Sequence, residues 1–138
     1  MKKTLFFGTI ILIFCQFSTP IIKDKTKLLT KQWLMVSLQI ENNKISEENL
    51  EKQRKKGIQT ILHFQKGGTC LVYIKTLKKK TTKKNQWKFT DDQNAIILQG
   101  ENDPPLKFKI EKLTSKKMIL VLEEEKTKQV FHYQAFKE

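Results

Sequence analysis

Residues 106–113, LKFKIEKL, show the clearest alternation of apolar and charged side chains in this chain of 138 residues. Apolar side chains stand at positions 106, 108 and 110, and charged ones at 107, 109 and 111. Successive side chains of a β-strand point to opposite faces of a sheet. The stretch therefore predicts a strand with one buried and one solvated face.

Further short strands are predicted on both sides of this one. A tight turn at Lys66-Gly67-Gly68 and a break at 102–105, NDPP, separate two of the pairs. No long crossover joins any pair, so neighbours are expected to pair antiparallel. The expected fold class is all-β, an eight-stranded antiparallel up-and-down β-barrel, with a sandwich as the alternative. The other predicted strands are 33–40, 58–65, 69–77, 85–90, 95–100, 118–124 and 129–136.

Two segments of the chain do not follow the strand pattern. Residues 23–32 are expected to form a short helical or irregular lead-in. Residues 46–56 predict one short helix between the first two strands, because Ser46 is a plausible N-cap and Gly57 would end it. Acidic residues in its first turn and basic residues in its last match the helix dipole. Only Leu50 is apolar, so this helix is expected at the surface.

Residues 1–19 have the three-part layout of a secretory signal peptide. Lys2 and Lys3 give a positive start, residues 5–15 form an apolar run, and polar residues lead to Pro20. The run is shorter than the roughly 20 residues that cross a bilayer. Export is therefore expected, to the periplasm or outside the cell, with the barrel domain at 20–138. Two alternatives stay open: an uncleaved anchor, and a lipid anchor at Cys15.

Export would also change the cysteine count. If Cys15 leaves with the signal peptide, Cys70 stands alone and no internal disulfide can form. Cys70 is then expected to be a small buried hydrophobic residue rather than a reactive thiol.

Positive charge dominates the composition, with 26 lysines, one arginine (Arg54) and a net charge of +13. Residues 78–84, KKKTTKK, are predicted to form a basic hairpin loop that an anionic envelope surface could contact. Export, and the lack of aromatic residues within the loop for stacking on bases, argue against nucleic acid. A solvated hairpin tip is the alternative. The basic patch consists of Lys78, Lys79, Lys80, Lys83 and Lys84.

Three segments resemble the lipocalin-like domain proteins that bacteria export. The first is 28–37, LLTKQWLMVS, with its early tryptophan, and the second is the hairpin 61–69, ILHFQKGGT. The third runs from NQWKF at 85–89 through an acidic turn to IIL at 96–98. Lys31 and Asn85 stand where that family often has glycine. The resemblance covers residues 28–136 and implies a calycin-type barrel, wide enough for side chains or one small apolar ligand.

The candidate cavity wall consists of apolar and aromatic side chains on the faces expected to point inward. Plain core packing is the alternative interpretation of the same set. Ser37, Thr60 and Tyr133 would supply the polar groups of such a cavity. The complete set is Trp33, Met35, Ser37, Thr60, Leu62, Phe64, Val72, Trp87, Phe89, Phe108, Met118, Leu120, Phe131 and Tyr133.

No motif in the chain names a reaction, so neither an enzyme nor a cofactor is expected. His63 and His132 lie far apart in the sequence, and their spacing does not suit zinc, so no metal site is expected. The carboxylates at 91–92 and 123–125 fall at turns or strand ends, whereas an acid–base pair needs burial.

These observations favour non-enzymatic binding of a small apolar or amphipathic ligand in a barrel cavity, in the cell envelope or secreted. The alternative is a structural or interaction module of the envelope with a packed core, whose basic surface contacts a polyanion or a protein.

Overall fold

The computed structural model describes residues 25–41, 43–45 and 47–137. The predicted signal segment, Cys15 and the predicted cap Ser46 lie outside these residues. The helices are α1 (Lys25–Leu29) and α2 (Glu47–Lys55). The strands are β1 (Gln32–Ile40), β2 (Asn43–Ile45), β3 (Gln59–Phe64), β4 (Thr69–Lys75), β5 (Lys80–Phe89), β6 (Ala95–Gly100), β7 (Leu106–Leu113), β8 (Lys117–Glu124) and β9 (Thr127–Phe136).

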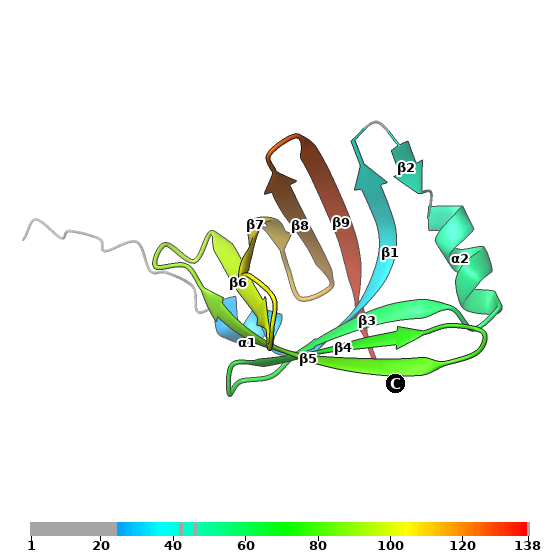
Figure 1. Cartoon of the computed structure of the whole chain (residues 1–138), viewed down its shortest axis with the longest axis horizontal. Helices are drawn as coiled ribbons and strands as arrows, with labels where there is room; N and C mark the ends of the chain where they lie inside the picture. The colour runs from blue at the N-terminus through cyan, green and yellow to red at the C-terminus, as the bar shows by residue number, and fades with distance from the viewer. Residues whose placement is uncertain (1–24, 42, 46, 138) are drawn as a thin grey trace, which may run out of the picture.

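The strands form one antiparallel sheet that closes on itself (Figure 1). The order is β1-β3-β4-β5-β6-β7-β8-β9, and β9 pairs back onto β1 from Gln32–Phe136 to Ile40–Gln129. This confirms the predicted eight-stranded up-and-down barrel and excludes the sandwich. The predicted helix is confirmed as α2, which lies between β1 and β3 along the chain.

One short strand was not predicted from the sequence. β2 pairs with the last three residues of β1, Leu38 to Ile40, so it adds a ninth strand to the sheet beside the barrel. Its three residues, Asn43, Lys44 and Ile45, are too few and too polar to show an alternating pattern.

The predicted basic loop at 78–84 is wrong for most of its length. A hydrogen bond from the Thr76 amide to the Lys79 carbonyl (2.8 Å) closes the turn, and β5 already begins at Lys80. Lys80 to Lys84 pair with Lys75 to Leu71 of β4. Lysine is tolerated there because this half of β5 lies at the surface, and the two threonines favour a strand.

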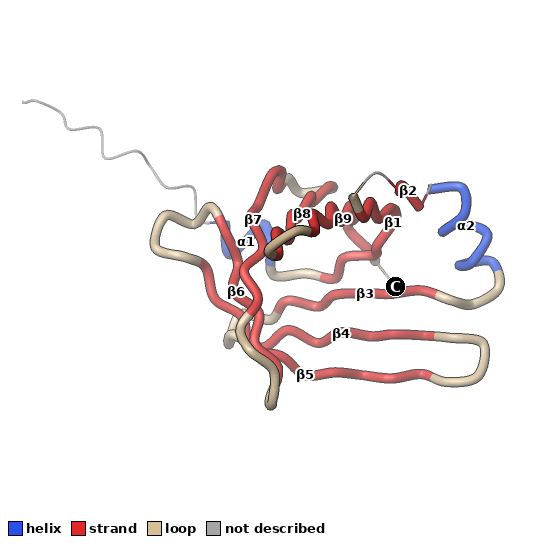
Figure 2. The backbone as a smooth tube through the Cα atoms, turned by 45° about the horizontal axis from the view of Figure 1, so that its top comes forward, coloured by secondary structure: helices blue, strands red, loops and turns tan. Residues whose placement is uncertain are grey.

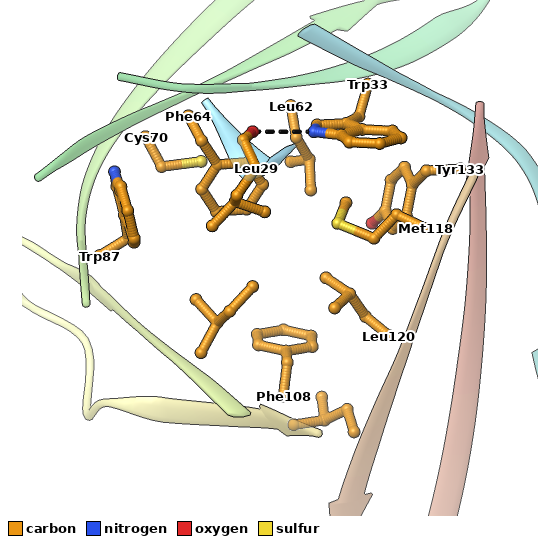
Figure 3. Packing of buried hydrophobic residues seen from close by; sticks show 12 residues of the cluster. Leu29, Trp33, Leu62, Phe64, Cys70, Trp87, Phe108, Met118, Leu120 and Tyr133 are labelled. Atoms are coloured by element: carbon orange, nitrogen blue, oxygen red, sulfur yellow. Dashed lines mark hydrogen bonds between the residues drawn. The ribbon is translucent and has the colours of Figure 1, made fainter. Parts of the chain in front are cut away.

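The barrel is filled by side chains from nearly every strand (Figure 3). Leu29 of α1 and Trp33 of β1 belong to this cluster and are completely buried. The buried members are Leu29, Trp33, Leu62, Phe64, Cys70, Trp87, Ile96, Phe108, Met118, Leu120, Leu122 and Tyr133. Among the described residues, no helix has both the length and the apolar character needed to cross a membrane.

Candidate functional site

The register of the strands shows which side chains share the inside of the barrel. Directly opposite residues of an antiparallel pair lie on the same face. Trp33 therefore shares a face with Leu62, Val72 and Lys83, because these residues are opposite one another across β1, β3, β4 and β5. A second inward row runs across β1, β9 and β8 and consists of Met35, Tyr133 and Met118.

Most of the predicted cavity-wall residues do lie together inside the barrel. Eight of them belong to the buried cluster: Trp33, Leu62, Phe64, Trp87, Phe108, Met118, Leu120 and Tyr133. Four more are half-buried and pack against it: Met35, Val72, Phe89 and Phe131. Thr60 is half-buried, on the same face of β3 as Leu62.

Ser37 is misplaced in the predicted set. A β-bulge between Met35 and Ser37 shifts the register, so Ser37 lies opposite His132 and Leu38 lies opposite Phe131. A bulge inserts one residue and thereby reverses which side chains point inward. Leu38 therefore takes the inward position, and Ser37 lies on the outer face, although it is buried.

One end of the barrel is closed by α1. The indole N–H of Trp33 donates to the carbonyl of Leu29 at 3.0 Å, which fixes the helix against β1 (Figure 3). The Lys31 ammonium lies 5.5 Å from the centre of the Trp33 ring. Trp87 makes a similar bond from its indole N–H to the carbonyl of Gln65 at 2.9 Å.

Aromatic rings pack against one another in the interior of the barrel. Trp87 meets Phe64 and Phe89 edge to face, with ring centres 5.7 and 5.4 Å apart. Phe131 packs edge to face on Phe108 at 5.9 Å and is stacked with Tyr133 at 6.3 Å. Edge-to-face and offset geometries are the favourable ones for aromatic pairs, so these contacts stabilise the packing.

The half of the barrel beyond Leu34 of β1 is called the open half, because β1 and β3 are not paired there and the sheet has a seam. β1 pairs with β3 only at Gln32, Trp33 and Leu34, although β1 is nine residues long. Beyond this point the wall formed by β1, β9 and β8 diverges from the wall formed by β3, β4 and β5 (Figures 1 and 2). α2 lies at this seam, where Arg54 Nη1 donates to the backbone carbonyl of Met35 at 3.4 Å.

Lys83 is a feature of the interior that the sequence analysis missed. Lys83 is an even number of positions away from Trp87 and Phe89 on β5, so the three side chains lie on the same face of the strand. It also lies opposite the inward residue Val72 of β4. Extending the alternation of residues 85–89 backwards would have placed it inward, but residues 78–84 were interpreted as a loop. Lys83 is thus an exposed residue on the inward face of β5, in the open half of the barrel.

The buried thiol and phenol are both held in their neutral forms. Burial raises the pKa of Cys70 to about 12, and a contact with the backbone of His63 opposes this only in part. Burial is also the main cause that raises the pKa of Tyr133. Cys70 is therefore a poor nucleophile, as its interpretation as a small buried hydrophobic residue predicted.

A separate hollow lies on the outer face of β6, β7 and β8. Its volume is about 700 Å³, and Ala95 and Val121 line it together with Lys107, Asp92 and Glu123. The Thr90 hydroxyl and the Asn94 backbone N–H both donate a hydrogen bond to the exposed carboxylate of Asp92. These bonds lower the pKa of Asp92, and the positive charge of Lys107 adds a smaller effect in the same direction. Charged side chains line much of this hollow, and the predicted cavity-wall residues do not border it.

The chain matches no model of a known protein family and no curated protein. The likeness to lipocalin-like proteins therefore stays a prediction from the three segments quoted above.

Proposed function

We propose that this protein is a non-enzymatic carrier of a small apolar or amphipathic ligand, which it holds in the open half of the barrel. One observation carries the proposal. β1 leaves β3 after Leu34, and the inward side chains Met35, Val72 and Phe131 pack against the core but keep part of their surface exposed. A soluble protein that keeps inward apolar groups partly accessible gains free energy when a ligand covers them.

The chemistry of the open half defines the ligand class. Met35 and Phe131 come from one wall and Val72 from the other, so an apolar group between them would contact both walls. Lys83 and Thr60 share the inner face with Val72 and would meet a polar or anionic end. The ligand is therefore amphipathic, with its apolar part directed toward Trp33 and Tyr133.

The filled half of the barrel limits the ligand's size. Eight-stranded barrels hold side chains or one small ligand. Because Trp33, Phe64 and Tyr133 are at most 6% exposed, the closed end has no room for a long chain. We therefore infer a ligand no larger than one ring system or a short acyl chain.

The signal-like segment at residues 1–19 supports a role outside the cytoplasm, in the cell envelope or in secreted form. A carrier there would protect an apolar molecule from water between membranes or between cells. The likeness to exported lipocalin-like proteins supports the same role.

A fluorescent naphthalene sulfonate, which is an anionic amphipathic probe, would test this proposal. The wild-type protein should bind the probe with saturation, and Val72→Trp should weaken binding at least tenfold because the indole would occupy the open half. Leu71→Trp is the matched control, since Leu71 is the adjacent half-buried residue on the outer face. Equal binding by both variants, or no saturable binding by the wild type, would refute the proposal.

A further inference from the structure

The half of β5 next to its hairpin is an open sheet edge. β5 pairs with β4 from Lys80 to Gln86, but it pairs with β6 only from Asn85 to Phe89. Figure 2 shows this half of β5 as the outer strand of the wall formed by β3, β4 and β5. Among the described residues, no strand pairs with Lys80–Lys84 on the side away from β4.

The hydrogen-bond alternation shows which backbone groups this edge offers. The Trp87 amide donates to the carbonyl of Gly68, and the Thr76 amide donates to that of Lys79. In an antiparallel ladder, alternate residues bond to the same neighbour. Residues 81 and 83 therefore bond toward β4, and Lys80, Thr82 and Lys84 direct their N–H and C=O groups to the free side.

The charge along this edge is positive and uncompensated. Lys75 and Lys80 lie directly opposite each other, an arrangement that like charges disfavour. Glu101 and Asp103 follow the last residue of β6, but the described ion pairs join only lysines and glutamates of α2. The repulsion between lysines also prevents two such edges from pairing with each other.

We propose that Lys80–Lys84 binds an extended acidic segment of a partner protein, which adds to the sheet as an antiparallel strand beside β5. The free backbone groups supply a ladder, and the lysines select an acidic sequence. A polyanion without a peptide backbone would use the charge but not the three free N–H groups, so the edge favours a peptide. This surface is distinct from the interior proposed for the ligand.

The register defines the partner sequence. Residues opposite Lys80 and Lys84 should be acidic, and the residue opposite Thr82 should be β-branched, because opposite side chains share a face. Thr82 also borders a hollow of about 240 Å³ on the outer face, lined by Ile61 and Tyr73. The probe is therefore acetyl-Thr-Glu-Thr-Val-Thr-Glu-Thr-amide, whose valine pairs with Thr82.

Amide hydrogen exchange followed by NMR would test this mode of binding. The probe should slow exchange at Lys80, Thr82 and Lys84, and leave Thr81 and Lys83 unchanged, because the amides of the last two already bond to β4. N-methylation of the probe's valine should weaken binding at least tenfold, since that N–H faces β5. N-methylation of the threonine after it is the matched control, since that N–H faces away, and it should change binding less than threefold.

A change in the protein gives an independent test. Thr82→Pro removes the edge N–H without removing a bond to β4, and proline is tolerated on an edge strand. It should abolish binding, and Thr82→Val, which keeps the N–H, should preserve it. If Thr82→Pro does not fold, the two N-methylated probes still decide. Equal weakening by both N-methyl groups, or binding of polyglutamate and heparin alike with no selective amide protection, would overturn the proposal.

Discussion

Trp33 shows how one polar atom can hold two elements together. Its indole N–H donates to the carbonyl of Leu29, and both residues are fully buried. We expect Trp33→Phe to lower the free energy of unfolding by about 2–3 kcal/mol, about 1 kcal/mol from the hydrogen bond and the rest from the smaller ring. Urea unfolding measures the change. Benzothienylalanine at position 33 keeps the shape and lacks the donor, so it should cost about 1 kcal/mol; a wild-type value would contradict this account.

Cys70 should make stability depend on alkaline pH. Its pKa is raised from 9.0 to about 12, so between these values the unfolded chain loses the thiol proton and the folded chain keeps it. The folded state then binds more protons, so stability falls as pH rises, by up to about 1.4 kcal/mol per pH unit, and Cys70 has no such effect below pH 9.

Cys70→Ala is the variant that isolates this effect, because the two proteins differ only at this side chain. Urea unfolding from pH 8 to 11 should show the stability advantage of the wild type over Cys70→Ala shrinking above pH 9. A constant difference in stability over this range would contradict the prediction, because it would show that the thiol loses its proton at the same pH in the folded and unfolded states.

Single residues also mark where sequence reasoning stops. The inward set from Leu62 to Tyr133 could be predicted because each of its members lies in a stretch of uninterrupted alternation. Ser37 could not, since the bulge before it depends on the pairing of β1 with β9, which lies about a hundred residues away. Periodicity carries no information on where a partner strand forces an extra residue.

At the scale of elements, the two neighbouring glycines of the β3–β4 turn differ in whether they can be replaced by a residue with a side chain. Gly68 has a φ of +85°, which side chains disfavour, whereas a Cβ on Gly67 would meet nothing within 4 Å. We expect Gly68→Ala to lower the free energy of unfolding by about 1–2 kcal/mol. Gly67→Ala is the control and should change it by less than about 0.5 kcal/mol. Equal effects of the two substitutions, measured by urea unfolding, would argue against strain at Gly68.

The strands differ in how well the sequence predicts them. The limits of β6 and β7 match the predicted 95–100 and 106–113, because polar turns or prolines mark both ends. β5 begins five residues before its predicted start, since five lysines in seven residues conceal a strand that is solvated on both faces. Composition predicts burial well, and it predicts strands poorly where nothing is buried.

At the scale of the whole molecule, the net charge of +13 opposes compaction. We expect the melting temperature to rise by a few degrees as sodium chloride increases from about 0.01 to about 1 M, because the Debye length falls from about 30 to about 3 Å. The double variant Lys80→Glu/Lys84→Glu carries four fewer units of positive charge and should show a smaller rise. A melting temperature that stays constant or falls would exclude self-repulsion as a significant term.

The closed order of the sheet could be predicted from the even spacing of strands and the absence of crossovers. The seam between β1 and β3 could not, because it depends on how far two strands remain paired, and both have apolar residues on each side of the point where they part. The interior is therefore better predicted than the entrance through which a ligand would reach it.

The pairing of β1 with β9 determines the order of events in folding. The longest ladder of β1 is the one with β9, so this ladder cannot be completed until Phe136 has been synthesised. Contacts this distant in sequence slow folding, since the intervening chain must first be ordered. We therefore expect a ribosome-bound chain that ends before β9 to keep unpaired edges on β1 and β8, which chaperones would bind until β9 has been synthesised.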